Sequence, residues 1–363
     1  MRKIEIVVLF LTMVLIGCKE YPPVVPDGSS VINIVAIGDT AVVDTIPHFV
    51  PMQNAKVILA SEYGMMIKST NELGLLNLTG LPAATYNISV RMPHPLYSNI
   101  LLVGNIRGVE VSPVRIVNDT IFATQVANTG ICINEIYSAG PVNNIFYFYD
   151  QYIELYNYSD EIKYLDGIIV MRVSGNNDGK GPGADEGDDG DIDGITYIFK
   201  FPGDPGQHNY PFYPHTFLVL ASTALNHKNY VSTSYDLSAA DWEFYNQYST
   251  SDFDNPNVPN LLNLRSDRTV DFLINLVSDV IVVASGEDTI WVDGIDISTI
   301  IDGVQYKSGV TSRKTLDPRV DKGYILSPPK YSGRSMRRRE PGVDTNDATL
   351  DWEMTLAVTP GYH

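Results

Sequence analysis

The sequence of 363 residues has few cysteines, few histidines and little positive charge. Its six histidines are scattered without a His-x-x-x-His spacing, and no Cys-x-x-Cys pair occurs, which argues against a zinc enzyme. A Gly-x-Ser-x-Gly elbow and a P-loop are also absent, so no motif of a hydrolase or a nucleotide site is present. Lysine and arginine total 25 against 43 acidic residues, and the net charge of −18 argues against general binding of nucleic acid.

Residues 1–18 have the pattern of a bacterial export signal. Two basic residues precede an apolar run from Ile4 to Ile16, which is shorter than the roughly 20 residues that a membrane-spanning helix needs. Gly17 directly before Cys18 resembles the lipobox of bacterial lipoproteins. The resemblance implies that residues 1–17 are a signal peptide and that Cys18 becomes the lipidated first residue.

A lipid on Cys18 would anchor the protein in the outer membrane, and the sequence leaves open the periplasmic face or the cell surface. An uncleaved anchor helix is the alternative to cleavage. Residues 18–30 contain prolines, a glycine and serines, which predict an extended tether. Because Cys18 carries lipid, Cys132 has no cysteine partner, and we expect it to be buried as a small apolar side chain.

From Val31 onward, short apolar runs alternate with turn residues, which predicts an all-β fold. Three of these segments are Ala55–Leu59, Ser69–Leu78 and Gly80–Val90. They resemble the carboxypeptidase-regulatory or prealbumin-like module. The resemblance implies a first β-sandwich at residues 31–127 that acts as a structural spacer without catalysis.

A second set of segments begins after Gly130 and includes Ile131–Ile136, Tyr152–Ser159, Gly333–Arg338 and Thr359–Gly361. These segments resemble a lamin-tail domain, and the resemblance implies an immunoglobulin-like β-sandwich at residues 128–363. A typical lamin-tail domain is shorter, so residues 174–215 and 222–270 are interpreted as two long insertions. Together with the lipobox, the arrangement is similar to Bacteroidota lipoproteins of unknown function (DUF4876-like).

Helix is expected to be scarce. Ser238–Tyr245 predicts one short helix, because a serine in the capping position is followed three residues later by an acid.

The first predicted insertion begins with a loop that is rich in glycine and acid. Asp189, Asp191 and Asp193 alternate along it, and carboxylates at this spacing can converge on Ca²⁺. The pattern departs from an EF-hand because Lys200 stands where the bidentate glutamate would be. The alternative is a solvated acidic loop that binds no ion.

Aromatic residues form the second candidate site. The run Phe146–Tyr149 precedes a predicted strand on which Tyr152, Tyr156 and Tyr158 share one face. An exposed row of tyrosines would stack on sugars or on a partner protein. The alternative is that the rings cover a half-buried face of the sheet.

Two further groups of charged residues stand out. Glu135 and Glu154 lie on strands expected to be adjacent, which would allow paired carboxylates for acid–base chemistry, although a structural hydrogen-bonding role is the stronger interpretation. The sequence has one cluster of basic residues, which comprises Arg334, Arg337, Arg338 and Arg339. We expect it either to dock internally on the aspartate-rich loop or to mark a surface that binds a partner.

Four Asp-Thr-aliphatic triplets resemble the acceptor motif for O-linked glycans in secreted Bacteroidota proteins. Their threonines are Thr40, Thr45, Thr120 and Thr289.

The sequence therefore predicts a non-enzymatic, lipid-anchored envelope protein that mediates binding or adhesion. The family resemblance implies an accessory to a TonB-dependent outer-membrane receptor. The alternative is a Ca²⁺-dependent, glycan-binding surface lipoprotein that uses the aspartate loop and the tyrosines.

Overall fold

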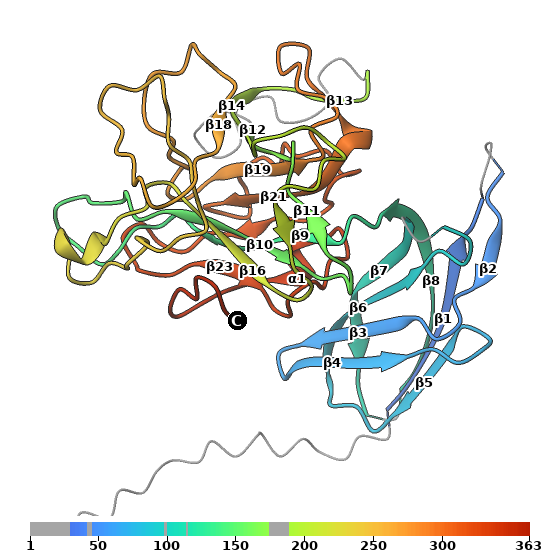
Figure 1. Ribbon diagram of the computed structural model, residues 1–363. Helices are drawn as coiled ribbons and strands as arrows, with labels where there is room; N and C mark the ends of the chain where they lie inside the picture. Colours follow the sequence, from blue (N-terminus) through green and yellow to red (C-terminus); the bar gives the residue numbers. More distant parts are fainter. Residues whose placement is uncertain (1–29, 42–45, 98–99, 114, 174–188) are drawn as a thin grey trace, which may run out of the picture.

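The computed structural model describes residues 30–41, 46–97, 100–113, 115–173 and 189–363 (Figure 1). The predicted lipidation residue Cys18, the predicted tether before Ser30 and residues 174–188 lie outside the described residues. Within the described part, the helical turns are limited to η1 (His227–Asn229), η2 (Ile297–Thr299) and α1 (Ala348–Asp351). The rest is strand, turn and loop, so the predicted all-β fold class is confirmed.

The first eight strands form one sheet in the order β2-β1-β8-β7-β6-β3-β4, with β5 also paired to β1. They are β1 (Val31–Asp39), β2 (Phe49–Pro51), β3 (Lys56–Ser61), β4 (Gly64–Ser69), β5 (Leu75–Thr79), β6 (Ala84–Pro93), β7 (Ile100–Val111) and β8 (Ile116–Ala127). Every second side chain of β1 is buried, as period-two alternation requires. Ile34 shares a core with Val57 and Val90 of distant strands, so the sheet folds over onto itself. We call residues 30–127 the N-terminal unit.

Residues 131–363, which we call the C-terminal unit, contain two six-stranded sheets. The first has the order β17-β16-β10-β9-β23-β24 and the second the order β18-β14-β12-β19-β21-β22. The strands of the first are β9 (Ile131–Tyr137), β10 (Tyr152–Asn157), β16 (Phe217–Ala221), β17 (Trp242–Glu243), β23 (Met336–Arg338) and β24 (Trp352–Met354). Those of the second are β12 (Ile169–Val173), β14 (Ile195–Lys200), β18 (Leu262–Asn263), β19 (Asp279–Ala284), β21 (Ile300–Lys307) and β22 (Ile325–Leu326).

The two sheets of the C-terminal unit face each other across one hydrophobic core. Ile133 and Leu155 of the first sheet belong to the same buried cluster as Val170 and Phe199 of the second. Two further pairs of short strands lie outside these sheets: β11 (Lys163–Tyr164) with β15 (Pro211–Phe212), and β13 (Asp191–Ile192) with β20 (Ile295–Asp296).

The two predicted insertions contribute to this core as well as to the surface. Strand β14 lies inside the second sheet, between β18 and β12. In the second insertion, Trp242, Phe244 and Leu261 are buried in the core. Neither segment is therefore only a surface loop.

The predicted helix at Ser238–Tyr245 is wrong. Residues 242–243 form β17 instead, which runs parallel to β16 and pairs Trp242 with Leu220. Trp242 and Phe244 both enter the core, and this tertiary packing outweighs the local capping signal.

Candidate functional site: an exposed aromatic knob

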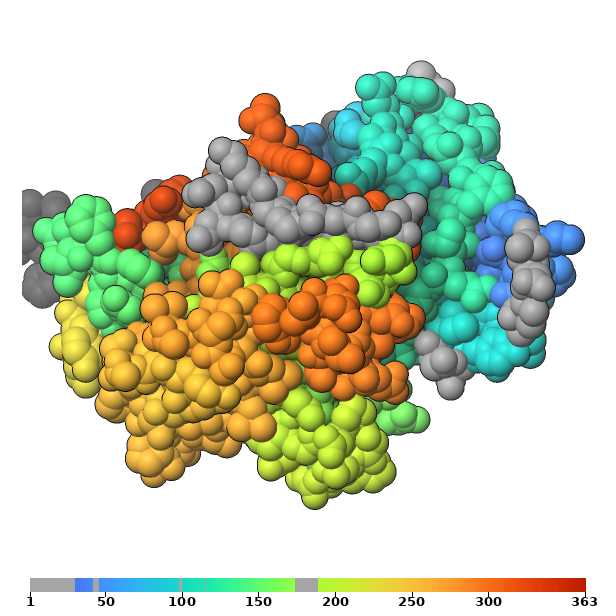
Figure 2. Space-filling model, turned by 90° about the horizontal axis from the view of Figure 1, so that it is seen from above, coloured from blue at the N-terminus to red at the C-terminus, as the bar shows by residue number. Residues whose placement is uncertain are grey.

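The loop between β9 and β10 carries a group of exposed apolar side chains. Phe146 is 71% exposed and Ile145 is 64% exposed, and Tyr230, just after η1, is 63% exposed. We call this group, together with two half-buried tyrosines that pack against it, the aromatic knob. Its exposed members are Val142, Ile145, Phe146, Tyr149 and Tyr230, and its half-buried members are Tyr147 and Tyr331. In Figure 1 the β9–β10 loop, in green, and the segment around η1, in yellow, reach the end of the molecule farthest from the N-terminal unit. Figure 2 shows the same two segments side by side.

The loop that carries the knob is fixed by the side chain of Asn143. Its Oδ1 atom accepts hydrogen bonds from the backbone N–H groups of Ile145 (3.0 Å) and Tyr147 (2.9 Å). Its Nδ2 group donates to the carbonyl oxygens of Pro141 (2.7 Å) and Tyr147 (3.0 Å). One asparagine thus closes the loop on both sides, as asparagine does in Asx turns.

Two bulky residues of the knob have left-handed backbone conformations. Phe146 has φ +61° and Tyr331 has φ +58°. Such angles are uncommon for large side chains and cost roughly 1–3 kcal/mol each. The two rings pack edge to face with centroids 5.7 Å apart, so the strained backbone holds Phe146 beside a ring from a distant loop.

Hydrogen bonds also fix the base of the knob. The Tyr147 hydroxyl donates to Nδ1 of buried His227 over 2.5 Å, and His227 Nε2 donates to the Thr223 carbonyl over 2.9 Å. Burial lowers the pKa of His227, which keeps the imidazole neutral. The Tyr147 and Tyr230 rings are nearly parallel, with centroids 6.0 Å apart.

Asp150 lies directly below the knob and is fully buried. It accepts hydrogen bonds from the Ser234 hydroxyl (2.5 Å) and the Tyr137 hydroxyl (3.2 Å). Burial raises its pKa to about 6. The knob residues themselves carry no ionisable side chain other than tyrosine, so the exposed surface is uncharged near neutral pH.

The predicted row of tyrosines on β10 is not an exposed platform. Tyr152 is fully buried in a small core with Tyr137 and Val219, so it is wrong as a ligand-binding residue. The prediction failed because this strand is covered on both faces. Tyr156 is half-buried and packs on Phe217, with ring centroids 4.6 Å apart.

Tyr158 is also half-buried, at the boundary between the two units. The guanidinium of Arg91 lies 5.8 Å from its ring centroid, and its hydroxyl donates to Asn128 Oδ1 over 3.3 Å. It forms part of the wall of a cavity of about 230 Å³ between the units and is not part of the knob.

The aspartates predicted to bind Ca²⁺ lie at the start of the region described after residue 188. Asp191 on β13 stands directly opposite Asp296 on β20. Burial, and then the neighbouring charges of Asp189 and Asp296, raise the pKa of Asp191. Among the described residues, no group of three or more acidic, histidine or cysteine side chains, Asp189, Asp191 and Asp193 included, could hold a metal ion.

Glu135 and Glu154 are brought together as predicted, because they are direct partners in the β9–β10 ladder. Both are fully buried, and both hold the C-terminal segment. Glu135 accepts from the backbone N–H (3.1 Å) and hydroxyl (2.5 Å) of Thr359, and Glu154 accepts from the Gly361 N–H over 2.6 Å. Burial raises the pKa of Glu154 to about 8. Their contacts are those of a structural clamp.

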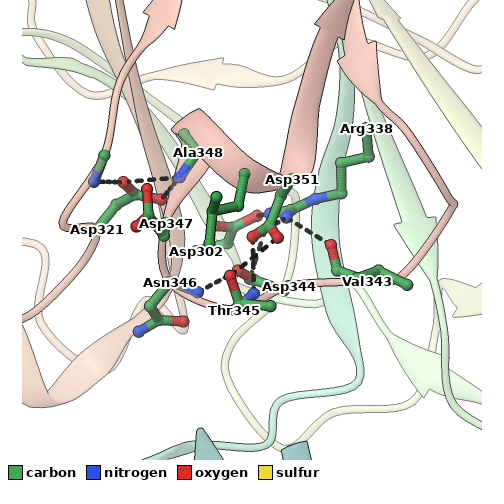
Figure 3. A network of polar contacts seen from close by, with 12 residues as sticks. Asp302, Asp321, Arg338, Val343, Asp344, Thr345, Asn346, Asp347, Ala348 and Asp351 are labelled. Atoms are coloured by element: carbon green, nitrogen blue, oxygen red, sulfur yellow. Dashed lines mark hydrogen bonds and ion pairs between the residues drawn. The ribbon is translucent and has the colours of Figure 1, made fainter. Parts of the chain in front are cut away.

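The basic cluster binds acidic residues of its own unit. Arg338 is fully buried, and its guanidinium lies 2.8 Å from Asp302, 3.2 Å from Asp344 and 3.6 Å from Asp351 (Figure 3). Arg338 is therefore not a partner surface, and its carboxylate partners lie outside the aspartate-rich loop. The other members have surface contacts: Arg337 and Arg339 with Glu353, and Arg334 with the Met354 sulfur.

The remaining predicted positions differ in exposure. Cys132 is buried as expected, and burial raises the pKa of its thiol to about 12. Thr120 is exposed and Thr289 half-buried, whereas Thr40 is buried and hydrogen-bonds His48. Thr45 and Cys18 lie outside the described residues. No helix in the part of the chain described is long and apolar enough to cross a membrane.

Comparison with known proteins gives one family and one structure. Residues 214–293 match DUF4876, described as a protein of unknown function. This stretch runs from before β16 to before β20 and includes Tyr230 of the knob. The crystal structure of a DUF4876 family protein from Bacteroides thetaiotaomicron is similar, with a TM-score of 0.54 and 18% sequence identity. The match covers 89% of this chain and 94% of that one, and it shows a shared fold. No curated protein matches.

Proposed function

We propose that this protein is a non-enzymatic, lipid-anchored protein of the outer envelope that binds a partner protein through the aromatic knob. The observation that carries the proposal is the knob itself. It is an exposed, uncharged and apolar surface on a protein with a net charge of −18. Soluble proteins rarely expose large contiguous apolar surface unless it meets a partner.

The knob also has the rigidity of a binding surface. Binding is weakened by every side chain and loop that must be ordered on association. Here the hydrogen bonds of Asn143 and the bond from Tyr147 to His227 order the loop beforehand. Phe146 is held exposed in a strained conformation, and such strain commonly marks functional loops.

The composition of the knob favours a protein as its partner. The exposed side chains include Val142 and Ile145, which lack the flat ring face that stacks on sugars, in addition to Phe146 and tyrosines. Tyrosine and other aromatic residues are the usual anchors of protein interfaces. A TonB-dependent outer-membrane receptor is the partner class that the family resemblance implies. The N-terminal unit and the tether would hold the knob away from the lipid anchor.

Photo-crosslinking tests this proposal in native membranes. A photoreactive phenylalanine analogue replaces Tyr149 in the knob, and in a control it replaces Tyr213, which is 56% exposed and outside the knob. We expect one defined crosslinked protein from position 149 only, and loss of that product when Phe146→Ser is added. Equal crosslinking from both positions, or a product that survives Phe146→Ser, would refute the proposal.

Glycan binding is the second candidate, because the nearly parallel Tyr147 and Tyr230 rings offer aromatic faces to a sugar. Glycan arrays with and without Ca²⁺ test whether the protein binds a glycan and whether that binding depends on Ca²⁺. Binding that needs Tyr230 and persists in a metal chelator would assign the knob to a glycan. Binding that needs Ca²⁺ and Asp191 would support the Ca²⁺-dependent alternative.

A further inference from the structure

Three basic side chains of the N-terminal unit reach one short segment of the C-terminal unit. Lys56 on β3 and Arg91 on β6 are direct ladder partners, and Arg107 lies on the adjacent strand β7. Lys56 Nζ lies 3.2 Å from a Glu340 carboxylate oxygen. Arg91 donates to the Gly342 carbonyl over 2.7 Å, completing a basic surface against residues 340–347.

The third of these contacts enters a buried site. The Arg107 guanidinium forms an ion pair with Asp347, whose side chain is only 1% exposed. Asp347 also caps α1, because its Oδ1 atom accepts the Thr349 N–H over 3.2 Å. An Arg side chain from one unit thus neutralises a carboxylate buried in the other.

The surroundings of Asp347 are rich in buried negative charge. Figure 3 shows it beside Asp321 at the start of α1, with Arg338 and its carboxylate partners nearby. The cations of the C-terminal unit that interact with these carboxylates include Arg338 and Lys314. The acidic residues of the region are Asp302, Asp321, Asp344, Asp347 and Asp351. Burial raises the pKa of Asp321 to about 7 and that of Asp351 to about 8.

Apolar packing as well as charged contacts join the two units here, because Ile58 of β3, only 5% exposed, lies beside Val343 and Leu350 of the C-terminal unit. A cavity of about 230 Å³ lies between them, with Leu101 and Val126 on one side and Asp302 and Asp344 on the other. A second cavity, of about 340 Å³, lies beside it and shares Val126 and Arg319. The ion pairs of Lys56 with Glu340 and of Arg107 with Asp347 add charged contacts to this boundary.

We infer that the N-terminal unit is an obligatory electrostatic partner of the C-terminal unit. Arg107 supplies a counter-charge that the buried carboxylates around α1 lack, so the two units are clamped and unfold together. The N-terminal unit is then more than a spacer. Its basic surface, formed by Lys56, Arg91 and Arg107, fits an acidic, turn-forming segment, and residues 340–347 occupy it in this chain.

Tryptophan fluorescence of the full-length protein provides a test, because all three tryptophans lie in the C-terminal unit, at Trp242, Trp291 and Trp352. Arg107 lies in the N-terminal unit, so a change in the tryptophan signal caused by Arg107→Ala reports an altered stability of the C-terminal unit. Leaving a buried carboxylate unpaired is strongly destabilising, so we expect the unfolding constant reported by tryptophan to rise about a hundredfold. The matched control is Arg115→Ala, whose side chain is 55% exposed and pairs with exposed Glu110. It should leave the transition unchanged.

A double-mutant cycle separates the ion pair from general damage. Asp347→Asn removes the charge and keeps a good capping side chain. In that background Arg107→Ala should change the unfolding constant less than about threefold, because the partner charge is gone. An equally large effect in both backgrounds would overturn the inference. So would a tryptophan transition that Arg107→Ala leaves unchanged. If Arg107→Ala does not fold, Arg107→Gln, which removes the charge and keeps a long side chain, replaces it in the cycle with the same criterion.

Discussion

Replacing Glu154 by glutamine should change how the stability of the protein depends on pH. Glu154 is fully buried between β9 and the C-terminal segment, and its pKa is raised to about 8. The folded protein therefore binds this proton more tightly than the unfolded chain does. The resulting stabilisation is complete below about pH 4.5 and is lost as the pH rises through about 8.

The size of the effect follows from the shift. One pKa unit corresponds to about 1.4 kcal/mol, so a shift from 4.5 to about 8 sets an upper limit of about 5 kcal/mol. Glu154 accepts from Asn134 over 2.8 Å and from Gly361 over 2.6 Å. A glutamine has one acceptor oxygen and satisfies only one of them, so Glu154→Gln should also lose about 1 kcal/mol at low pH.

Urea unfolding between pH 5 and pH 8.5 measures both quantities. We expect the free energy of unfolding of the wild type to fall as the pH rises, and to fall less steeply in Glu154→Gln. Glu161→Gln is the matched control, because the Glu161 side chain is 79% exposed and forms a surface ion pair with Lys163. It should reproduce the wild-type slope. The reasoning fails if Glu154→Gln keeps the full slope, or if the wild type becomes more stable with rising pH.

Three further outcomes are expected. Arg338→Met should lower the free energy of unfolding by about 3–5 kcal/mol in urea titrations, since it removes the cation beside the buried carboxylates of Asp302 and Asp351 and the half-buried one of Asp344. A change below about 1 kcal/mol would contradict the network. The buried Cys132 thiol, whose pKa is raised to about 12, should react with a thiol reagent only after the protein unfolds. Rapid labelling of the native protein would contradict the burial of this thiol. Phe146→Gly should leave the free energy of unfolding unchanged or raise it by up to about 1 kcal/mol, because glycine accepts φ +61° without strain. The same substitution should abolish partner binding. A large loss of stability in thermal unfolding would show that Phe146 is structural.

Much of the fold could be predicted because strands leave a period-two pattern. Tyr86, Ile88 and Val90 alternate with polar residues in the sequence, and all three are buried in the core of the N-terminal unit on β6. Cys132, in an apolar run, is buried as expected. The segment Ser238–Tyr245 was misassigned because its capping signal is local, whereas Trp242 and Phe244 are held by contacts with distant strands.

The candidate site was only partly visible in the sequence. The run Phe146–Tyr149 shows the aromatic content of the knob, but Tyr230 and Tyr331 come from loops far away in the chain. Only the tertiary fold brings these three segments together. Tyr152 illustrates the opposite error, because a period-two pattern shows which residues share a face but not whether that face is covered.

Internal docking of the basic cluster was one of its two predicted roles, but the burial of Arg338 and its actual partners were not predicted, for a similar reason. Arg338 sits in a run of surface-type residues, and nothing local distinguishes it from Arg337 or Arg339. Its burial depends on Asp302 and Asp351, which reach it from other parts of the chain. Arg107 is equally inconspicuous until the N-terminal unit is placed beside α1.

The central claim is that the aromatic knob makes the contact with a partner, and a binding titration on native outer membranes tests it most directly. Purified protein with Phe146→Ser is compared with the wild type and with Tyr213→Ser, an exposed position outside the knob. We predict that Phe146→Ser weakens binding at least about tenfold, as loss of an interface anchor does, and that Tyr213→Ser binds like the wild type. Equal affinity of all three proteins would contradict the claim.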